Sequence, residues 1–313
     1  MLQHYIIAGG TGFIGQQLVQ HWLEQGIRVT VVSRTLKTVQ NIFGDSVKGL
    51  TWVDLEQHSS AQLHPVSLIV NLCGASVGEK RWTENRKTEL IRSRMQSTTI
   101  LSQLCAALAD KAPILFNASA ASFYGYSESP SPVFDEDSPI NLNQTHHFLS
   151  DLAHAWEEST EIAKAHGVHV INLRFGVVLG KGGGILKKMT LPFKLGLGGK
   201  LGDGTQPMSW IHIRDVVNII DFLREHPELH GGINLTAPEV VTQLKFAQTL
   251  AHTLKRPSCF STSAKFLKYV YGEMADELLL SGQAVYPKRL LEAGYQFQFP
   301  SLEMALQDIV AVA

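Results

Sequence analysis

The segment that decides the fold is Tyr5-Ile6-Ile7-Ala8-Gly9-Gly10-Thr11-Gly12-Phe13-Ile14-Gly15. The apolar run before Gly9 is typical of a buried parallel strand, which is covered on both faces and need not alternate. After Gly15, apolar residues recur at helical spacing until Gly26, a residue type that commonly ends helices. The segment therefore predicts a strand, a glycine turn and a helix in immediate succession.

Three of these glycines, Gly10, Gly12 and Gly15, have the G-x-G-x-x-G spacing of a dinucleotide-binding turn. Glycine suits each place because the turn is tight, the backbone must approach a pyrophosphate, and the helix packs closely on the strand. The helix N-terminus then presents free N–H groups to the phosphates. An ordinary tight turn is the alternative, but the strand before it and the helix after it favour a cofactor. The predicted contacts are Gly9, Gly10, Thr11, Gly12, Phe13, Ile14 and Gly15.

The next strand, residues 28–32, indicates which dinucleotide binds. An NAD site usually has an acidic residue at the end of this strand to hold the ribose hydroxyls. This chain has Ser33 and Arg34 there, and Lys37 one turn later. Cations beside a hydroxyl fit the 2′-phosphate of NADP, although cations at a strand end are often merely solvated. Because the glycine turn lies just upstream, we expect NADP(H) as the cofactor.

Composition places the chain among ordinary globular proteins. Its residues are 44% hydrophobic and 18% charged, with a formal net charge of −1. A length of 313 residues is enough for one large or two interlocked domains. Because there is no basic excess, we expect neither nucleic acid nor an anionic membrane as a partner. No apolar stretch has the length of a bilayer span, and the N-terminus enters a strand almost at once, so we expect no signal peptide.

Cysteine and histidine spacing gives no support for a metal site. Cys73, Cys105 and Cys259 are scattered, with no C-x-x-C pair, and they suit a reducing compartment. The thirteen histidines include the adjacent pair His146 and His147, which cannot share a helix face. We therefore expect a cytoplasmic protein without a metal.

Through the first half of the chain, strand-like runs alternate with helical ones. Such alternation predicts an α/β fold with a doubly wound parallel sheet and helices on both faces. Strands are predicted near residues 50–53, 68–71, 114–117 and 168–173, and helices near 83–110 and 148–166. Ligands of such sheets bind at the carboxyl ends of the strands. The candidates at these ends are Gly12, Arg34, Asp54, Gly74 and Ser119.

The pattern changes after Leu173. Glycine-rich segments at 180–184 and 196–204 precede a return to strand and helix character at 209–223, and short helices dominate from Thr236 onward. We expect residues 1–175, with 208–235 returning to them, to form the cofactor-binding domain. Residues 176–207 and 236–313 are expected to form a smaller, mostly helical substrate lobe over the open edge of the sheet.

These motifs resemble the extended short-chain dehydrogenase/reductase superfamily. Within it, the chain is similar to an atypical branch of NAD(P)-binding epimerase-family proteins with a distinctive C-terminal domain, some labelled cell division inhibitor. The resemblance rests on Gly9 to Gly15, Asn71 to Ala75, Trp82, Ser93-Arg94, Ser119 to Gly125, Ala155 to Glu157, Arg174 to Gly180, Met208 to Asp215, and Leu278 to Leu291. It implies a Rossmann sheet with a smaller substrate lobe. It further implies cofactor contacts from Asp54, Leu55, Cys73, Gly74, Ala75, Arg174, Phe175, Gly176 and Val177.

The catalytic pair of the superfamily is missing from this sequence. Ordinary members use Tyr-x-x-x-Lys on a helix, where the cation lowers the pKa of the phenol so that it can act as general acid and base. No tyrosine here has a lysine four places later, and the corresponding helix offers Phe148 and Leu152. Those two share an apolar face with Trp156 and are expected to pack in the core. The serine of the superfamily is also displaced, since Ser119 stands one residue away from the aligned position.

Two functions remain open from the sequence. One is an NADPH-dependent oxidoreductase or epimerase acting on a small molecule, with Ser119 and Tyr124 as the preferred proton donors and Glu79 and His147 as further candidates. Its pocket is expected between Ser119, Tyr124, Phe175 and a wall formed by Met208, Trp210 and His212, with the glycine-rich loops closing over it. Packing between the lobes is the alternative role of Trp210 and His212. The other function is a non-enzymatic NADP(H) sensor or scaffold.

Overall fold

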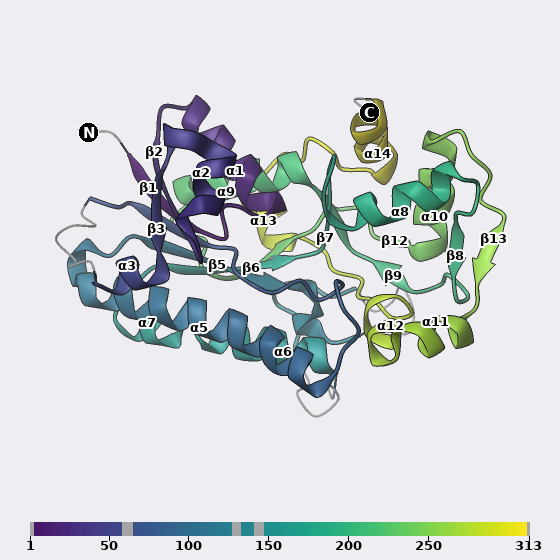
Figure 1. Cartoon of the computed structure of the whole chain (residues 1–313), viewed down its shortest axis with the longest axis horizontal. Helices are drawn as coiled ribbons and strands as arrows, with labels where there is room; N and C mark the ends of the chain where they lie inside the picture. The colour runs from purple at the N-terminus through teal and green to yellow at the C-terminus, as the bar shows by residue number, and fades with distance from the viewer. Residues whose placement is uncertain (1–2, 58–64, 127–132, 141–146, 312–313) are drawn as a thin grey trace.

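The computed structural model describes residues 3–57, 65–126, 133–140 and 147–311. At its centre lies a seven-stranded sheet in which every neighbouring pair is parallel (Figure 1). The strand order is β11-β6-β5-β4-β1-β2-β3, so the order reverses between β1 and β4. The strands are β1 (His4–Ala8), β2 (Arg28–Ser33), β3 (Lys48–Thr51), β4 (Leu68–Asn71), β5 (Ile114–Ala120), β6 (Val170–Phe175) and β11 (Gly231–Leu235). Ligands of such sheets bind at this reversal, beyond the carboxyl ends of the strands.

Helices cover both faces of the sheet (Figure 1). One face carries α1 (Phe13–Glu24), α2 (Leu36–Phe43), α9 (Ile213–Glu225) and α13 (Lys288–Glu292), which share a core with the sheet. The other face carries α3 (Trp52–Gln57), α5 (Glu84–Leu108), α6 (Phe148–Glu158) and α7 (Glu161–Ala165). The predicted doubly wound α/β fold is confirmed.

A buried ladder of asparagines ties α5 and α6 to the middle of the sheet. Asn71 on β4 pairs in register with Asn117 on β5, and the Asn71 amide donates to the Asn117 side-chain oxygen (2.8 Å). Thr98 of α5 donates to the same oxygen (3.0 Å), and the Trp156 indole of α6 donates to the Thr98 hydroxyl (3.1 Å). Because buried polar groups are costly when unpaired, this network fixes both helices beside the carboxyl ends of β4 and β5.

Local chemistry changes some of the predicted boundaries. Trp52 and Val53 begin α3 instead of ending a strand, because Asp54 accepts hydrogen bonds from the Thr51 N–H (2.8 Å) and hydroxyl (2.7 Å) and turns the chain there. The expected helix 148–166 is divided into α6 and α7. Among the short helices expected after Thr236, α11 (Ala264–Tyr271) and α12 (Glu273–Leu278) are separated at Gly272, whose φ of +63° favours glycine. The described residues also contain short 3₁₀ turns, η1 (Gly44–Ser46), η2 (Ala109–Lys111) and η3 (Ala121–Tyr124).

The smaller lobe lies beside the carboxyl ends of the sheet (Figure 1). Its helices include α8 (Gly184–Lys194), α10 (Gln243–Thr253), α11, α12 and α14 (Leu302–Ala311). In two short strand pairs, β8 (Gly199–Leu201) pairs with β13 (Phe260–Thr262), and β9 (Pro207–Met208) pairs with β12 (Val241–Thr242). A further pair, β7 (Val177–Leu179) with β10 (Trp210–His212), connects the lobe to the sheet domain. Near the end of the chain, Leu290 and Tyr295 return to the core under the sheet. None of the helices described is both long and apolar enough to cross a membrane.

Candidate functional site

The turn between β1 and α1 has a backbone that only glycine permits at two places. Gly9 has a φ of +81°, and its carbonyl accepts from the N–H of Gly12 (3.0 Å). A side chain on Gly15 would overlap the Gly9 carbonyl and the Gly10 backbone. Gly12 is the N-cap of α1, and the first turn of α1 carries no acidic residue. The turn therefore leaves helix N–H groups available to an anion such as a pyrophosphate.

The first glycine-rich loop, residues 180–184, packs on the ring of Phe13. A Cβ added to Gly180 would lie 2.7 Å from the Phe13 ring, and one added to Gly183 would overlap it. The side chain of Phe13 thus faces this loop, which leaves its backbone for a cofactor. The second glycine-rich segment is held in the lobe, because β8 pairs with β13 and Gly204 accepts from the N–H of Leu244 (2.9 Å).

Cations stand beside the end of β2. Ser33 is the last residue of β2, and Arg34 and Lys37 are exposed. Arg34 also lies near Cys73, which follows the end of β4. Burial raises the pKa of the Cys73 thiol to about 12, and the nearby charge of Arg34 opposes that rise. Ser33, Arg34 and Lys37, which are predicted to contact a 2′-phosphate, therefore lie at or just after the end of β2, at the same sheet edge as the glycine turn after β1.

The loops after β3 and β4 offer mostly backbone to a ligand. The carboxylate of Asp54 is used in capping α3, and Leu55 is buried in the core. After β4, the hydroxyl of Ser93 accepts from the Ala75 N–H (3.0 Å). This contact fixes the position of Ala75 at the sheet edge, and the backbone of Gly74 beside it lies against the Arg94 guanidinium.

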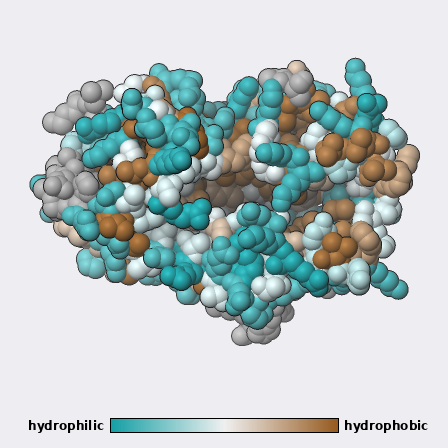
Figure 2. Space-filling model, viewed as in Figure 1, coloured by the Kyte–Doolittle hydropathy of each residue, from teal (hydrophilic) through white to brown (hydrophobic). Residues whose placement is uncertain are grey.

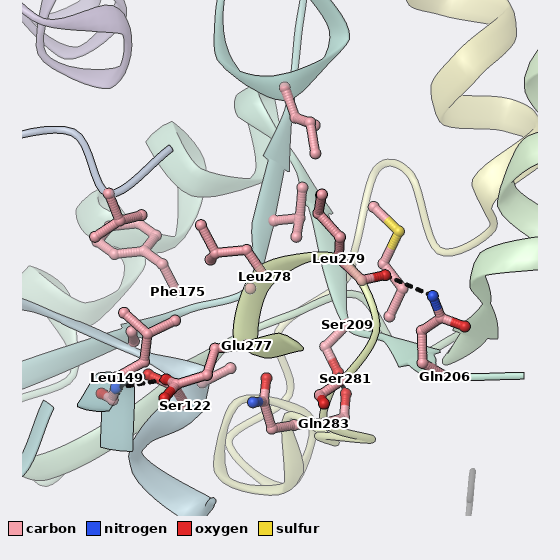
Figure 3. A pocket seen from close by; sticks show the side chains of 18 of the residues that line it. Ser122, Leu149, Phe175, Gln206, Ser209, Glu277, Leu278, Leu279, Ser281 and Gln283 are labelled. Atoms are coloured by element: carbon pink, nitrogen blue, oxygen red, sulfur yellow. Dashed lines mark hydrogen bonds between the residues drawn. The ribbon is translucent and has the colours of Figure 1, made fainter. Parts of the chain in front are cut away.

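A cavity of about 370 Å³ lies between the sheet edge, α6 and the smaller lobe (Figure 3). Figure 2 shows apolar residues in the hollow between the two halves of the molecule. The walls are mainly aliphatic and aromatic, with a few polar side chains among them. On the sheet side the lining residues include Ser119 to Ser122, Leu149, Leu152, Trp156 and Phe175 to Val177. On the lobe side they include Gln206, Met208, Ser209, Gln243, Leu278, Leu279 and Ser281 to Gln283.

Ser119 lines the cavity and belongs to a buried network behind it. Its hydroxyl donates to Oε1 of Glu157 (2.7 Å), and Glu157 forms a two-point ion pair with Arg174 through Nε (2.8 Å) and Nη2 (3.0 Å). Burial alone would lower the pKa of Arg174, but the ion pair with Glu157 raises it above its usual value. The guanidinium of Arg174 is thus engaged by Glu157 and Tyr124, and the cofactor contact implied for Arg174 by the family resemblance stays a prediction.

Tyr124 is part of the same network and does not line the cavity. Its hydroxyl accepts from Nη1 of Arg174 (2.8 Å) and donates to the Asn234 side-chain oxygen (2.9 Å). Burial raises the pKa of Tyr124 even though Arg174 opposes the rise. The structure thus places Tyr124 behind the cavity wall, in a position that orients Arg174 and, through Glu157, Ser119.

Of the three predicted substrate residues, Met208 alone lines the cavity. Trp210 is fully buried in the core of the smaller lobe. His212 caps α9, accepting from the N–H of Arg214 (3.2 Å), and its ring lies 3.8 Å from that of Phe299. Trp210 therefore packs within the lobe, and His212 connects α9 of the sheet domain with Phe299 of the lobe core.

The remaining acid/base candidates lie away from the cavity lining. Glu79 is exposed and pairs with Arg86 at 3.8 Å. His147 is the N-cap residue of α6, and its ring lies 4.5 Å from that of Tyr126. Phe148 packs on Trp82 with ring centroids 5.0 Å apart, which agrees with its expected structural role.

Sequence reasoning missed Glu277, a lining residue from α12. Its carboxylate accepts from the backbone N–H groups of Phe148 and Leu149 (both 2.9 Å) and from the Tyr126 hydroxyl (3.1 Å). It thus caps the N-terminus of α6 from the smaller lobe, next to Leu149 in the cavity wall (Figure 3). The only sequence signal was indirect: α6 begins without a Ser, Thr, Asp or Asn cap of its own.

Two family models match the chain. Residues 5–235 match the NAD dependent epimerase/dehydratase family, and residues 263–309 match a domain of unknown function, DUF1731. An epimerase family protein of Staphylococcus epidermidis is 33% identical over 310 residues, covering 99% of each chain. One from Staphylococcus aureus is 34% identical over 313 residues, covering 99% of this chain and 100% of the relative.

Solved structures agree with this assignment. The human epimerase family protein SDR39U1 (isoform 2), crystallised with NADPH, superposes with a TM-score of 0.88 at 34% identity, covering 99% of both chains. UDP-glucose 4-epimerase of Thermus thermophilus, in complex with NAD, has a TM-score of 0.78 at 15% identity and covers 99% of this chain and 98% of its own, a likeness of fold alone. The chain belongs to the NAD dependent epimerase/dehydratase family.

Proposed function

We propose that the protein is an NADP(H)-dependent oxidoreductase or epimerase acting on a small molecule held in the cavity. The observation that carries this proposal is the position of the cavity. It opens beside Ser119 and Phe175 to Val177, at the carboxyl ends of β5 and β6. A molecule in it lies next to the edge where the glycine turn and Arg34 converge, which is where such folds bind their ligands.

The residues present fit NADP(H) in the chemistry of their donors. The uncapped first turn of α1 and the glycine backbone suit the pyrophosphate, and Ser33, Arg34 and Lys37 suit a ribose 2′-phosphate. The human relative whose structure contains NADPH supports the same choice. Bound there, the cofactor would supply or accept a hydride; the rest of the chemistry falls to the chain.

For that chemistry, the Ser119–Glu157 pair is the best-placed proton-handling group. The serine hydroxyl faces the cavity and is hydrogen-bonded to a carboxylate, so it can take a proton from a substrate hydroxyl while passing its own to Oε1 of Glu157. Arg174 and Tyr124 hold that carboxylate in position. The apolar walls around Ser119 exclude water and strengthen this hydrogen bond.

A non-enzymatic NADP(H) sensor is the second candidate. It is favoured by the mainly apolar cavity lining and by the structural roles of Phe148, Tyr124 and Arg174. For either function, we propose a small-molecule ligand, no nucleic acid and no membrane partner, and a cytoplasmic location.

Turnover separates the two candidates. The purified protein would be incubated with NADPH and a panel of aldehydes, ketones and nucleotide sugars, and cofactor oxidation and sugar products would be measured. We expect turnover of at least one compound, reduced by about 10²-fold or more in Ser119→Ala. Ser122→Ala is the matched control, because Ser122 also lines the cavity but donates to the Leu149 carbonyl (3.1 Å). NADPH binding without turnover of any compound would favour the sensor.

A further inference from the structure

The cavity wall contains a buried positive charge for which the described residues supply no carboxylate. Arg94 of α5 lines the cavity and is 8% exposed. Its Nη1 donates to the Leu90 carbonyl (3.0 Å) and its Nη2 to the Ala75 carbonyl (3.2 Å), both neutral acceptors. Arg174, by contrast, faces Glu157. Because removing a charge from water is costly, a buried guanidinium is normally paired with an anion.

The guanidinium of Arg94 packs between the backbone of Gly74 and the ring of Trp156. A Cβ added to Gly74 would lie 3.0 Å from its Cζ, and the ring centroid of Trp156 lies 4.8 Å from the same atom. These contacts hold Arg94 in place. A neutral glutamine side chain could donate to the same two carbonyls at a lower desolvation cost, so these hydrogen bonds alone do not explain a charged residue here. Burial lowers the pKa of Arg94 to about 10, with Arg86 acting in the same direction, so the side chain remains charged at neutral pH.

The other polar groups of the lining leave the cavity with unsatisfied donors. Glu277 is the one acidic residue among the described lining residues, and its oxygens already accept from the N-terminus of α6 and from Tyr126. The Gln243 amide accepts from the Leu201 N–H (2.9 Å), while its buried Nε2 has no partner within the described parts of the chain. A ligand that brings a carboxylate would give Arg94 the counter-charge that these lining residues do not supply.

We propose that the cavity binds a small carboxylate whose charged end contacts Arg94 and whose apolar body lies against the lobe. The apolar walls formed by Leu152, Leu278 and Met208 accommodate that body. Ordinary members of the superfamily have a lysine at the position of Leu152 on α6. Here Arg94 of α5 would supply the positive charge instead. Arg94 stacks on Trp156, which lies one turn of α6 after Leu152. This inference rests on the proposed function in taking the cavity as the substrate site.

Cinnamate and cinnamamide are the probes, since they match in size and shape and differ in charge. Each would be titrated by calorimetry at low salt into the full-length protein, with and without NADP⁺. We expect cinnamate to bind at least tenfold more tightly than cinnamamide, with the difference decreasing as salt is added. Arg94→Gln should bring the two affinities within about twofold, and Arg94→Lys, which keeps the charge, should retain part of the preference. Arg92→Gln is the matched control, because Arg92 lies on the same helix and is exposed.

Equal affinities for the two probes in the unmodified protein would overturn the proposal, as would a preference that persists in a folded Arg94→Gln variant. The titration of the cofactor-free protein does not depend on NADPH, so failure of cofactor binding would be seen separately. NADPH binding together with equal probe affinities would leave the proposed cofactor site intact and remove the carboxylate site alone.

Discussion

Replacing Glu157 with glutamine tests the buried network behind the cavity. The substitution keeps the shape of the side chain but leaves the guanidinium of Arg174, a residue that is 7% exposed, without its counter-charge. Two charge-assisted hydrogen bonds, at 2.8 and 3.0 Å, lose their charged acceptor. Removing one partner of a buried pair costs about 3–5 kcal/mol. We expect the free energy of unfolding in urea to fall by that amount at neutral pH.

A double-mutant cycle makes the test specific to the pair. Arg174→Met alone should also destabilise the protein, but the double variant should lose clearly less than the sum of the single losses, because the second change removes an unpaired charge. Glu161→Gln is the control, since Glu161 pairs with Lys164 at the surface (2.7 Å) and should change stability by at most about 1 kcal/mol. Additive losses for Glu157 and Arg174, or a loss no larger than the control, would refute the reasoning.

Two further predictions concern stability. Leu152→Ala should cost about 2–3 kcal/mol in denaturant unfolding, at the low end for a buried leucine because the side chain borders a cavity; an unchanged free energy would show that this face does not contribute to packing. Burial, with smaller contributions from Arg28 and Lys48, lowers the pKa of His4 to about 4. The unfolded chain binds a proton near pH 6.5 and the folded chain does not, so stability should fall by about 2–3 kcal/mol between pH 6.5 and 4. His4→Gln should remove that part of the pH dependence, and unchanged pH dependence would contradict the assignment.

The features that sequence predicts correctly are those in which local chemistry determines local structure. The apolar run of β1 and the glycines after it could be assigned because a buried strand and a close turn each restrict residue type over a few positions. Thr83 could be assigned as the cap of α5 for the same reason, and its hydroxyl accepts from the Arg86 N–H (3.2 Å). Such signals extend over a single element and need no knowledge of distant contacts.

The roles of polar side chains at the cavity could not be predicted in this way. Tyr124 is engaged by Asn234, 110 residues later, and Glu277 caps a helix that begins 129 residues earlier. The family resemblance implies a cofactor contact for Arg174 but gives no sign that its guanidinium is bound by Glu157 on α6. Partners so far apart in sequence meet only after the sheet and the lobe have come together, so composition and spacing contain no signal for them.

We propose above all that the sheet edge binds NADP(H) through the glycine turn and the cations after β2. Calorimetric titration of NADPH and NADH into the unmodified protein and into Arg34→Glu tests it most directly. Charge-assisted contacts contribute about 1.5–3 kcal/mol each, so NADPH should bind the unmodified protein at least about tenfold more tightly. The Arg34→Glu variant should lose or reverse that preference while still binding NADH. Equal affinities in the unmodified protein, or a preference that Arg34→Glu leaves unchanged, would contradict the account.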